Sequence, residues 1–173
     1  VMIDVAEALL RIQRAAVVVQ PRRVRIEDAV GLRLQEDVIS DTDSPPWHRS
    51  MMDGFAVISK DFVHSSDCKQ AVTLKVVAKV GAGETTATVL KRDQCIRIMT
   101  GAPMPAGADA VIPIERAVSG TSNAQAGEQV SVQDPHFRCG QHVSEKGSFF
   151  RAGQTVIHHG VELELVHIGL AAE

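Results

Sequence analysis

Five short runs rich in valine and isoleucine lie in the middle of the chain, and they constrain its fold more than any other feature. Clusters of glycine, proline and aspartate separate these runs. β-Branched residues favour extended backbone, and the intervening clusters favour turns. The runs are therefore predicted to be strands, at residues 54–58, 71–80, 95–99, 108–114 and 129–132.

The two ends of the chain carry helical periodicity instead. Near the start, Asp4 is placed to cap a helix and Glu7 follows three residues later, which is the reciprocal arrangement of a capping box. Near the end, Val166 and Leu170 share one face at helical spacing. Because helices flank a β-rich middle, we expect the ends to pair in one domain and the middle to form an inserted one. The predicted fold class is α+β, predominantly β, with two small domains.

Composition and charge argue against several functional classes. The net charge is −3 and only 3% of the 173 residues are aromatic, so neither charge nor base stacking favours nucleic acid. The apolar runs are too short to span a bilayer, so no membrane association is expected. The three cysteines, Cys68, Cys95 and Cys139, are odd in number and lack metal-ligand spacing. We therefore expect reduced thiols in a cytoplasmic protein.

The first candidate site segment is Ser44-Pro-Pro-Trp-His-Arg-Ser-Met-Met-Asp-Gly-Phe-Ala-Val57. In it, Asp53 follows a loop containing prolines and precedes Gly54, which allows a tight turn where a strand begins. A carboxylate at such a junction can accept hydrogen bonds or approach a metal ion. The simpler alternative is that Asp53 and Gly54 only make a turn.

The second candidate segment is Ile96-Arg-Ile-Met-Thr-Gly-Ala-Pro-Met-Pro-Ala-Gly-Ala-Asp-Ala-Val-Ile-Pro-Ile-Glu115. One strand leads into Thr100 and Gly101, and a second strand ends at Glu115. Loops of this kind can present several backbone N–H groups and a threonine hydroxyl to an anion. The glycine spacing matches neither a dinucleotide fingerprint nor a P-loop, so a proline-stiffened hairpin is the alternative.

Seven histidines raise the question of a metal site. His158 and His159 are adjacent, so on a strand they would point to opposite faces and could not chelate one ion together. The other histidines have no ligand-type spacing. We expect no histidine-based metal site.

Together, the two segments give the chain a family resemblance. The pair SPPWHRSMMDGFAV and IRIMTGAPMPAGADAVIPIE closely resembles the paired signatures of the MoeA/gephyrin family, the molybdopterin molybdenumtransferases. The opening DVAEALLRI resembles the family's first helix, and VGLRLQEDV resembles the strand that follows it. The closing VELELVHIGLAAE resembles the helix that leads into the next domain. The resemblance covers essentially all 173 residues.

This resemblance implies a fold and a reaction. Full-length family members are homodimers that insert molybdenum from molybdate into adenylylated molybdopterin, with Mg²⁺, and release AMP. The chain resembles only their N-terminal domains I and II. That implies a discontinuous elongated domain from residues 1–26, about 41–53 and 140–173, and a β-rich inserted domain from about 27–40 and 54–139. Other molybdenum cofactor biosynthesis proteins are candidate partners.

The resemblance also assigns roles to residues. The family's acidic residue falls on Asp53 and its pocket threonine falls on Thr100, which makes both candidate catalytic residues. Gly54, Gly101 and Ser50 match substrate-binding positions. Asp53 could hold a Mg²⁺-bound water or position a pterin or phosphate group, and no other metal ligand is assigned within the chain.

In the family, the pocket forms where the second domain of one subunit faces the α/β domain of the other. Because that α/β domain is expected beyond Glu173, the chain alone is expected to be inactive and to dimerise incompletely.

Three positions depart from the family pattern: Gln141, His142 and Met52. Gly140-Gln141-His142 stands where family members often carry Gly-Glu-Asp, so two carboxylates are replaced by neutral groups. Met52 stands where some relatives carry lysine. These departures leave open a non-catalytic dimerisation or scaffolding module of a divergent paralogue. A sugar- or nucleotide-binding β domain unrelated to molybdenum is a third possibility.

Overall fold

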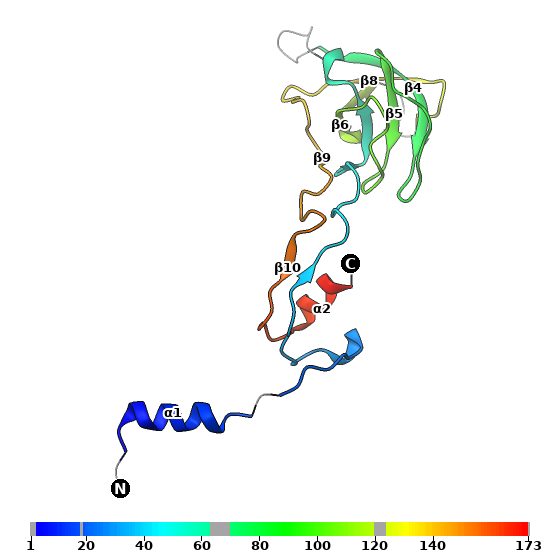
Figure 1. The fold of residues 1–173 in the computed structure, drawn as a ribbon. Coiled ribbons are helices and arrows are strands. Elements are labelled where there is room, and N and C mark those ends of the chain that lie inside the picture. Colours follow the sequence, from blue (N-terminus) through cyan, green and yellow to red (C-terminus); the bar gives the residue numbers. More distant parts are fainter. Residues whose placement is uncertain (1–2, 18, 63–69, 120–123, 173) are drawn as a thin grey trace. The chain divides into compact units, whose positions relative to one another are not determined.

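The computed structural model describes residues 3–17, 19–62, 70–119 and 124–172, and Cys68 lies outside them. The structure is mostly β with few helices, as predicted (Figure 1). The chain divides into two compact units, here called the terminal unit (Val1–Val38 with Thr155–Glu173) and the central unit (Ile39–Gln154). Packing therefore places residues 27–38 with the chain ends, and 39–53 and 140–154 with the middle. The bounds of these units differ from the domain ranges that the resemblance implies. The domain ranges therefore stay a prediction.

The first helix, α1 (Val5–Ala15), begins where the sequence predicts. Oδ1 of Asp4 accepts a hydrogen bond from the backbone N–H of Glu7 at 2.7 Å. The reciprocal half of the expected capping box does not form, because the Glu7 carboxylate accepts from Nε of Arg11 at 2.8 Å instead. The helix is amphipathic, yet none of its residues is buried within this chain.

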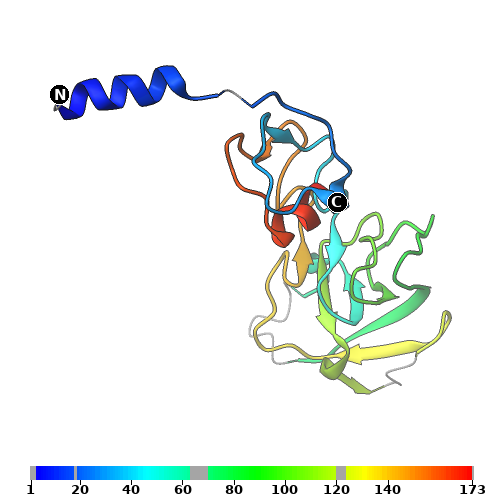
Figure 2. The same ribbon diagram turned by 90° about the horizontal axis from the view of Figure 1, so that it is seen from below.

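The rest of the terminal unit is built from two chain segments that pair with each other. The backbone N–H of Leu34 donates to Val161 at 2.9 Å, and that of Leu163 donates to Leu32 at 2.8 Å. Beside this pairing lie the 3₁₀ turn η1 (Ile26–Asp28), the short strands β1 (Val38–Ile39) and β10 (Thr155–Ile157), which pair, and the helix α2 (Leu165–Ala171). α2, red in Figure 2, contributes to the same groove as the residues around η1.

The adjacent histidines of the terminal unit do not lie on a strand, so the expectation of opposite strand faces is wrong. They follow β10, and both turn toward Asp37. Nδ1 of His159 is 2.8 Å from Oδ1 of Asp37, and Nδ1 of His158 is 3.7 Å from Oδ2. The backbone N–H of His159 also donates to Oδ1 at 2.7 Å. This backbone hydrogen bond is the main reason why the pKa of Asp37 is lowered.

The central unit is organised around one six-stranded sheet. Its strands are β3 (Gly54–Val57), β4 (Val72–Val80), β5 (Gln94–Ile98), β6 (Ala110–Pro113), β7 (Ala117–Ser119) and β8 (Gln129–Val132). Their order is β6-β3-β5-β4-β8-β7, with β4 and β5 parallel and every other neighbouring pair antiparallel. All but β7 overlap the predicted strands.

Strands β3 and β5 are buried on both faces, so alternate side chains enter two separate cores. In β3, Phe55 and Val57 enter one core and Ala56 enters the other. In β5, Cys95 enters the first core and Ile96 the second. Burial raises the pKa of the Cys95 thiol to about 12, so this cysteine is an inert packing group.

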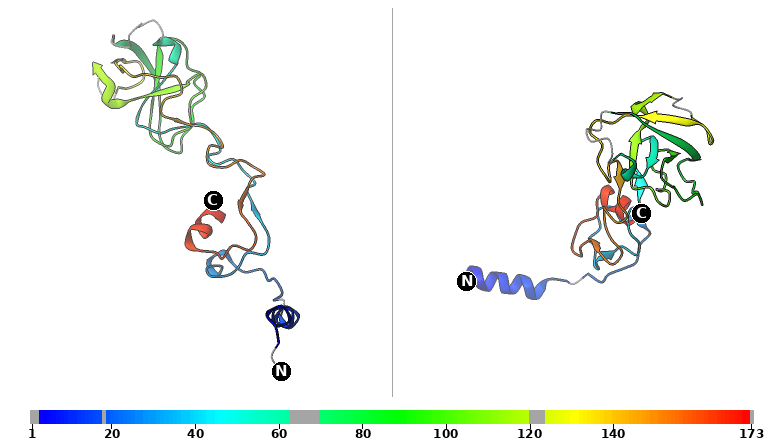
Figure 3. Two further views of the ribbon diagram at one scale, coloured as in Figure 1. Left: turned by 90° about the vertical axis from the view of Figure 1, so that its left-hand side faces the viewer. Right: turned by 90° about the horizontal axis from the view of Figure 1, so that it is seen from above.

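Two extended segments of the central unit, 39–50 and 143–154, run side by side (Figure 3). The backbone N–H of Ser44 donates to Phe150 at 2.9 Å, and β2 (Arg49–Ser50) pairs with β9 (Val143–Ser144). The 3₁₀ turns η2 (Ser59–Asp61) and η3 (Ile114–Arg116) follow β3 and β6. Across the described residues, no helix is long and apolar enough to cross a membrane.

Candidate functional site

Asp53 is held at the entrance to β3 by a close approach of two strands. Its carbonyl accepts the backbone N–H of Ile114 at 3.0 Å. The next residue, Gly54, faces Ile112 of β6, and a Cβ at Gly54 would lie 2.0 Å from the Ile112 carbonyl oxygen. Only glycine allows this approach, so Gly54 fixes the place of Asp53 through the backbone.

Thr100 lies in the turn that follows β5, and this turn is tied to the segment before Asp53. The backbone N–H of Gly101, whose φ is +82°, donates to Ser50 at 2.9 Å. In return, the N–H of Ser50 donates to Ala102 at 2.9 Å. The Ser50 hydroxyl is buried and donates to the Met52 carbonyl at 2.6 Å. Ser50 therefore shapes the loop that carries Asp53, while its substrate-binding role stays a prediction.

The two candidate catalytic residues meet directly. Oδ1 of Asp53 accepts both the backbone N–H and the hydroxyl of Thr100, each at 2.7 Å. These two bonds, backbone first, lower the pKa of Asp53, and attraction to Arg97 lowers it further. Within the described part of the chain, Oδ2 of Asp53 has no hydrogen-bond partner, and the side chain is exposed. Asp53 is thus an ionised acceptor with one oxygen open to a ligand.

The turn around Thr100 does not offer the anion cradle that its composition suggests. Both donors of Thr100 are directed at Asp53, and the N–H of Gly101 is directed at Ser50. The N–H groups of the neighbouring residues donate to backbone carbonyls: Met99 to Val80, Ala102 to Met99, and Met104 to His48. With these donors used, the site accepts hydrogen bonds rather than giving them.

Arg97 is the residue of this site that the sequence reasoning missed. It lies in β5, three residues before Thr100, and is 8% exposed, although its neighbours Ile96 and Ile98 are core residues. Its Nη1 donates to the carbonyls of Gly54 at 2.9 Å and Ile98 at 2.8 Å. The sequence did contain a signal for Arg97, which is a charged residue within an otherwise apolar strand. A guanidinium buried there needs hydrogen-bond partners or a counter-charge, so such a residue is a candidate for a structural role at the site.

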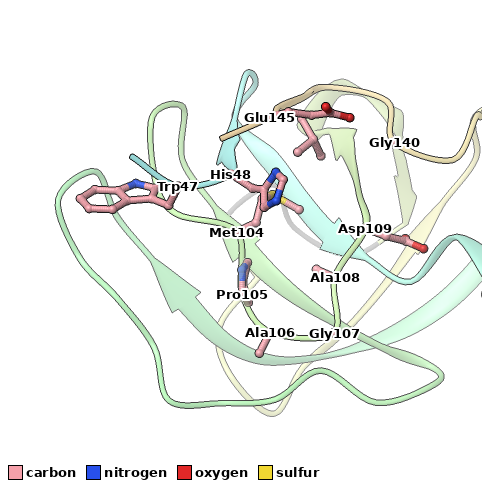
Figure 4. Close-up of a pocket in the computed structure, with 11 residues that line it drawn as sticks. Trp47, His48, Met104, Pro105, Ala106, Gly107, Ala108, Asp109, Gly140 and Glu145 are labelled. Atoms are coloured by element: carbon pink, nitrogen blue, oxygen red, sulfur yellow. The ribbon is translucent and has the colours of Figure 1, made fainter. Parts of the chain in front are cut away.

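A separate hollow of about 480 Å³ lies on the same unit (Figure 4). It is lined by Trp47 and His48 from the proline loop, by residues 104–109, and by Gly140, Val143 and Glu145. None of the predicted site residues lines it. Asp109 at its edge is engaged by Ser59, whose N–H and hydroxyl donate to its two oxygens at 2.6 and 2.7 Å.

The model of one protein family, described as the MoeA N-terminal region (domain I and II), matches residues 3–173. The chain belongs to this family. Molybdopterin molybdenumtransferase of Staphylococcus epidermidis is 35% identical to this MoeA N-terminal region over 116 residues, which cover 67% of the chain and 27% of that protein. Molybdopterin molybdenumtransferase 2 of Mycobacterium tuberculosis is 33% identical over 153 residues, covering 88% of the chain and 36% of that protein. The chain therefore spans about a third or less of these curated relatives' length.

Solved MoeA structures share the fold. A molybdopterin biosynthesis MoeA protein from Pyrococcus horikoshii is 29% identical, with a TM-score of 0.80 over 98% of this chain and 41% of that one. A second structure from the same species is 26% identical, with a TM-score of 0.76 over 87% of this chain and 38% of that one.

In this MoeA region, the departure at Gln141 has a structural explanation. Nε2 of Gln141 donates to Oδ2 of Asp134 at 3.0 Å and to the Val111 carbonyl at 3.3 Å. A glutamate there would set a second carboxylate against Asp134, so this surrounding favours the neutral amide. His142, at φ +56°, holds the site loop through its carbonyl, which accepts the N–H of Met51 at 2.8 Å.

The donor set of the MoeA region fits part of a Mg²⁺ site. Across the described residues, no group of three histidine, cysteine or acidic side chains could hold a metal ion. Mg²⁺, however, usually keeps several waters and takes only one or two carboxylates, with substrate phosphates completing its shell. The open Oδ2 of Asp53 meets that requirement as a single oxygen ligand or as an acceptor for a metal-bound water.

Proposed function

We propose that this chain is the N-terminal region of an enzyme that inserts molybdenum from molybdate into adenylylated molybdopterin, with release of AMP. Support comes from family membership, from relatives named molybdopterin molybdenumtransferase, and from the Asp53–Thr100 pair. We place this enzyme in the cytoplasm, as a homodimer that needs Mg²⁺.

The observation that carries the proposal is the open carboxylate oxygen of Asp53. Thr100 occupies Oδ1 and keeps the carboxylate ionised, so Oδ2 can accept a hydrogen bond from a pterin N–H group or from a Mg²⁺-bound water. When bound, Mg²⁺ would neutralise phosphate charge in the substrate. Thr100 positions Asp53 in this scheme, and its hydroxyl oxygen retains lone pairs that can accept from the same ligand.

The chain supplies one side of the proposed site. Asp53 and Thr100 are exposed, and neither lines the hollow of Figure 4 or the groove of the terminal unit. Because the chain spans only 27% to 36% of these curated relatives, we expect residues 1–173 alone to show no molybdenum insertion. Measurable insertion by this chain alone would contradict that expectation.

The test is Asp53→Asn in a protein of the relatives' full length. Asparagine keeps the size of the side chain but removes its charge, so we expect molybdenum insertion to fall on the order of 10²-fold, as when one preorganised electrostatic group is lost. Asp41→Asn is the matched control, since Asp41 is an exposed carboxylate in the same unit. Unchanged insertion in the Asp53→Asn protein would remove Asp53 from the reaction. Retained substrate binding without turnover in the unmutated protein would instead favour a scaffolding module.

We expect the proposed homodimer to form through α1. Val5, Leu9 and Ile12 lie on one side of this helix at helical spacing and are 77%, 55% and 66% exposed. An apolar stripe of this kind is typical of a helix that is covered in an assembly. We expect Leu9→Glu to shift the full-length protein from dimer to monomer in light scattering, and an unchanged mass would contradict the assignment of this stripe.

A further inference from the structure

Arg97 brings a buried positive charge to the two strand ends that carry the candidate site. It lies on β5 directly opposite Phe55 of β3, in the register that also pairs Gly54 with Ile98. Its guanidinium carbon lies 5.6 Å from the centroid of the Phe55 ring, which is a cation–π contact. Burying such a group is costly unless its donors and charge are compensated.

Backbone carbonyls next to the site accept hydrogen bonds from the buried guanidinium of Arg97. Nη1 of Arg97 donates to the carbonyl of Gly54, which follows Asp53, and to the carbonyl of Ile98, which lies two residues before Thr100. One nitrogen therefore joins the start of β3 to the end of β5. Any separation of these strand ends would stretch one of the two bonds and move Asp53 away from the Thr100 donors.

We propose that Arg97 is the positioning residue of the Asp53–Thr100 pair: its two hydrogen bonds lock together the strand ends that carry these two residues. Its importance for molybdenum insertion rests on the proposed function. Its effect on Asp53 does not, because that effect follows from geometry and charge within the chain.

Electrostatics of the surrounding groups agree with this role. Two carboxylates act on Arg97, Asp53 from the segment before β3 and Glu115 from η3, and both favour its charged form against the effect of burial. In turn, Arg97 contributes to the lowered pKa of Asp53 after the two Thr100 hydrogen bonds. Because the arginine is buried, solvent screens this attraction less than it would between two surface charges.

The geometry also explains why a lysine or a neutral residue is a poor substitute. A guanidinium stays charged under all physiological conditions and is planar, so it can face the Phe55 ring while directing N–H groups at carbonyls. A methionine of similar length would leave the carbonyls of Gly54 and Ile98 without these donors. A glutamine could restore a donor but no charge.

The test measures hydrogen exchange of the Thr100 amide by NMR in this chain, because that amide donates to Asp53. We expect Arg97→Met and Arg97→Gln each to speed this exchange several-fold relative to the amide of Val130, a core residue of the same sheet. Arg97→Lys should speed it less, because an ammonium group can still donate to a carbonyl. Should the methionine variant fail to fold, the glutamine and lysine variants still decide the question.

Arg116→Met is the matched control. Arg116 lies in the same unit and forms a 3.9 Å ion pair with Asp134, so its loss removes one positive charge without touching Asp53. A folded Arg97→Gln chain in which Thr100 exchange is unchanged would overturn the proposal, as would an equal increase at the Thr100 and Val130 amides. If Thr100 exchange speeds up while full-length Arg97→Gln inserts molybdenum at the normal rate, the positioning stands and the proposed function of Asp53 fails.

Discussion

Asp53 receives both donors of Thr100 on one carboxylate oxygen, Oδ1, at 2.7 Å each. Two charge-assisted bonds hold Oδ1, while Oδ2 has no hydrogen-bond partner among the residues that the structure describes. The pair joins two loops that are 47 residues apart in the chain. Its properties therefore report on whether the central sheet is correctly assembled.

Replacing Thr100 by valine should raise the pKa of Asp53. Valine has nearly the same shape but lacks the hydroxyl donor, while the stronger contribution from the backbone N–H remains. Asp53 has a depressed pKa in the folded state, so its contribution to stability is present above the ordinary value of 3.8 and is lost as pH falls through the folded pKa. With valine at this position that acid-dependent contribution should shrink. NMR titration of Asp53 measures the change.

Thr73→Val is the control for that experiment. The Thr73 hydroxyl bonds Ser131 at 2.7 Å across β4 and β8, away from the site. It should leave the Asp53 midpoint where it is. An Asp53 midpoint that is equally unmoved in Thr100→Val would show that the hydroxyl bond does not act in solution.

Two glycines of the site should respond differently to alanine. At Gly54 the new Cβ would meet the Ile112 carbonyl at 2.0 Å within the sheet, so we expect the free energy of unfolding to fall by about 3 kcal/mol. At Gly101 the Cβ would meet open space, and only the positive φ is unfavourable, which costs about 1 kcal/mol. Urea denaturation measures both, and a larger loss at Gly101 than at Gly54 would contradict the close strand approach.

Asp37 should make the terminal unit sensitive to acid. Its pKa is lowered, first by the His159 backbone N–H and then by the His159 side chain. Its contribution to stability is therefore present above pH 3.8 and disappears as pH falls through the lower folded pKa. The melting temperature of Asp37→Asn should lie below that of the unmutated chain at pH 7, and the gap should narrow below pH 3.8. A constant gap across this range would argue against the Asp37–His159 contact.

Substitutions in the core of the central sheet should lower the free energy of unfolding much more than substitutions on α1. Ile96 is fully buried in β5, so Ile96→Ala should lower the free energy of unfolding by about 3 kcal/mol. Val5 on α1 is 77% exposed, so Val5→Ala should change it by less than about 0.5 kcal/mol in this chain. Denaturation of the isolated chain measures both. A large loss at Val5 would mean that α1 is covered in solution.

The sequence was sufficient for the local features. Runs of valine and isoleucine placed β3, β4, β5, β6 and β8, because side-chain preference and turn residues act over a few neighbouring positions. Asp4 predicted the start of α1 in the same way. The two motif segments carried the family resemblance, which the match over residues 3–173 confirms.

Only the tertiary structure decided which groups meet. The turn after β5 looks able to bind an anion in sequence, but its Thr100 donors are taken by Asp53, far away in the chain. From the sequence, Gln141 is only a position where an expected carboxylate is missing. The structure shows that its side-chain amide donates to Asp134. Arg97 gains its place beside Asp53 from strand pairing. Hydrogen-bond partners depend on the pairing of distant segments, and local periodicity does not encode that pairing.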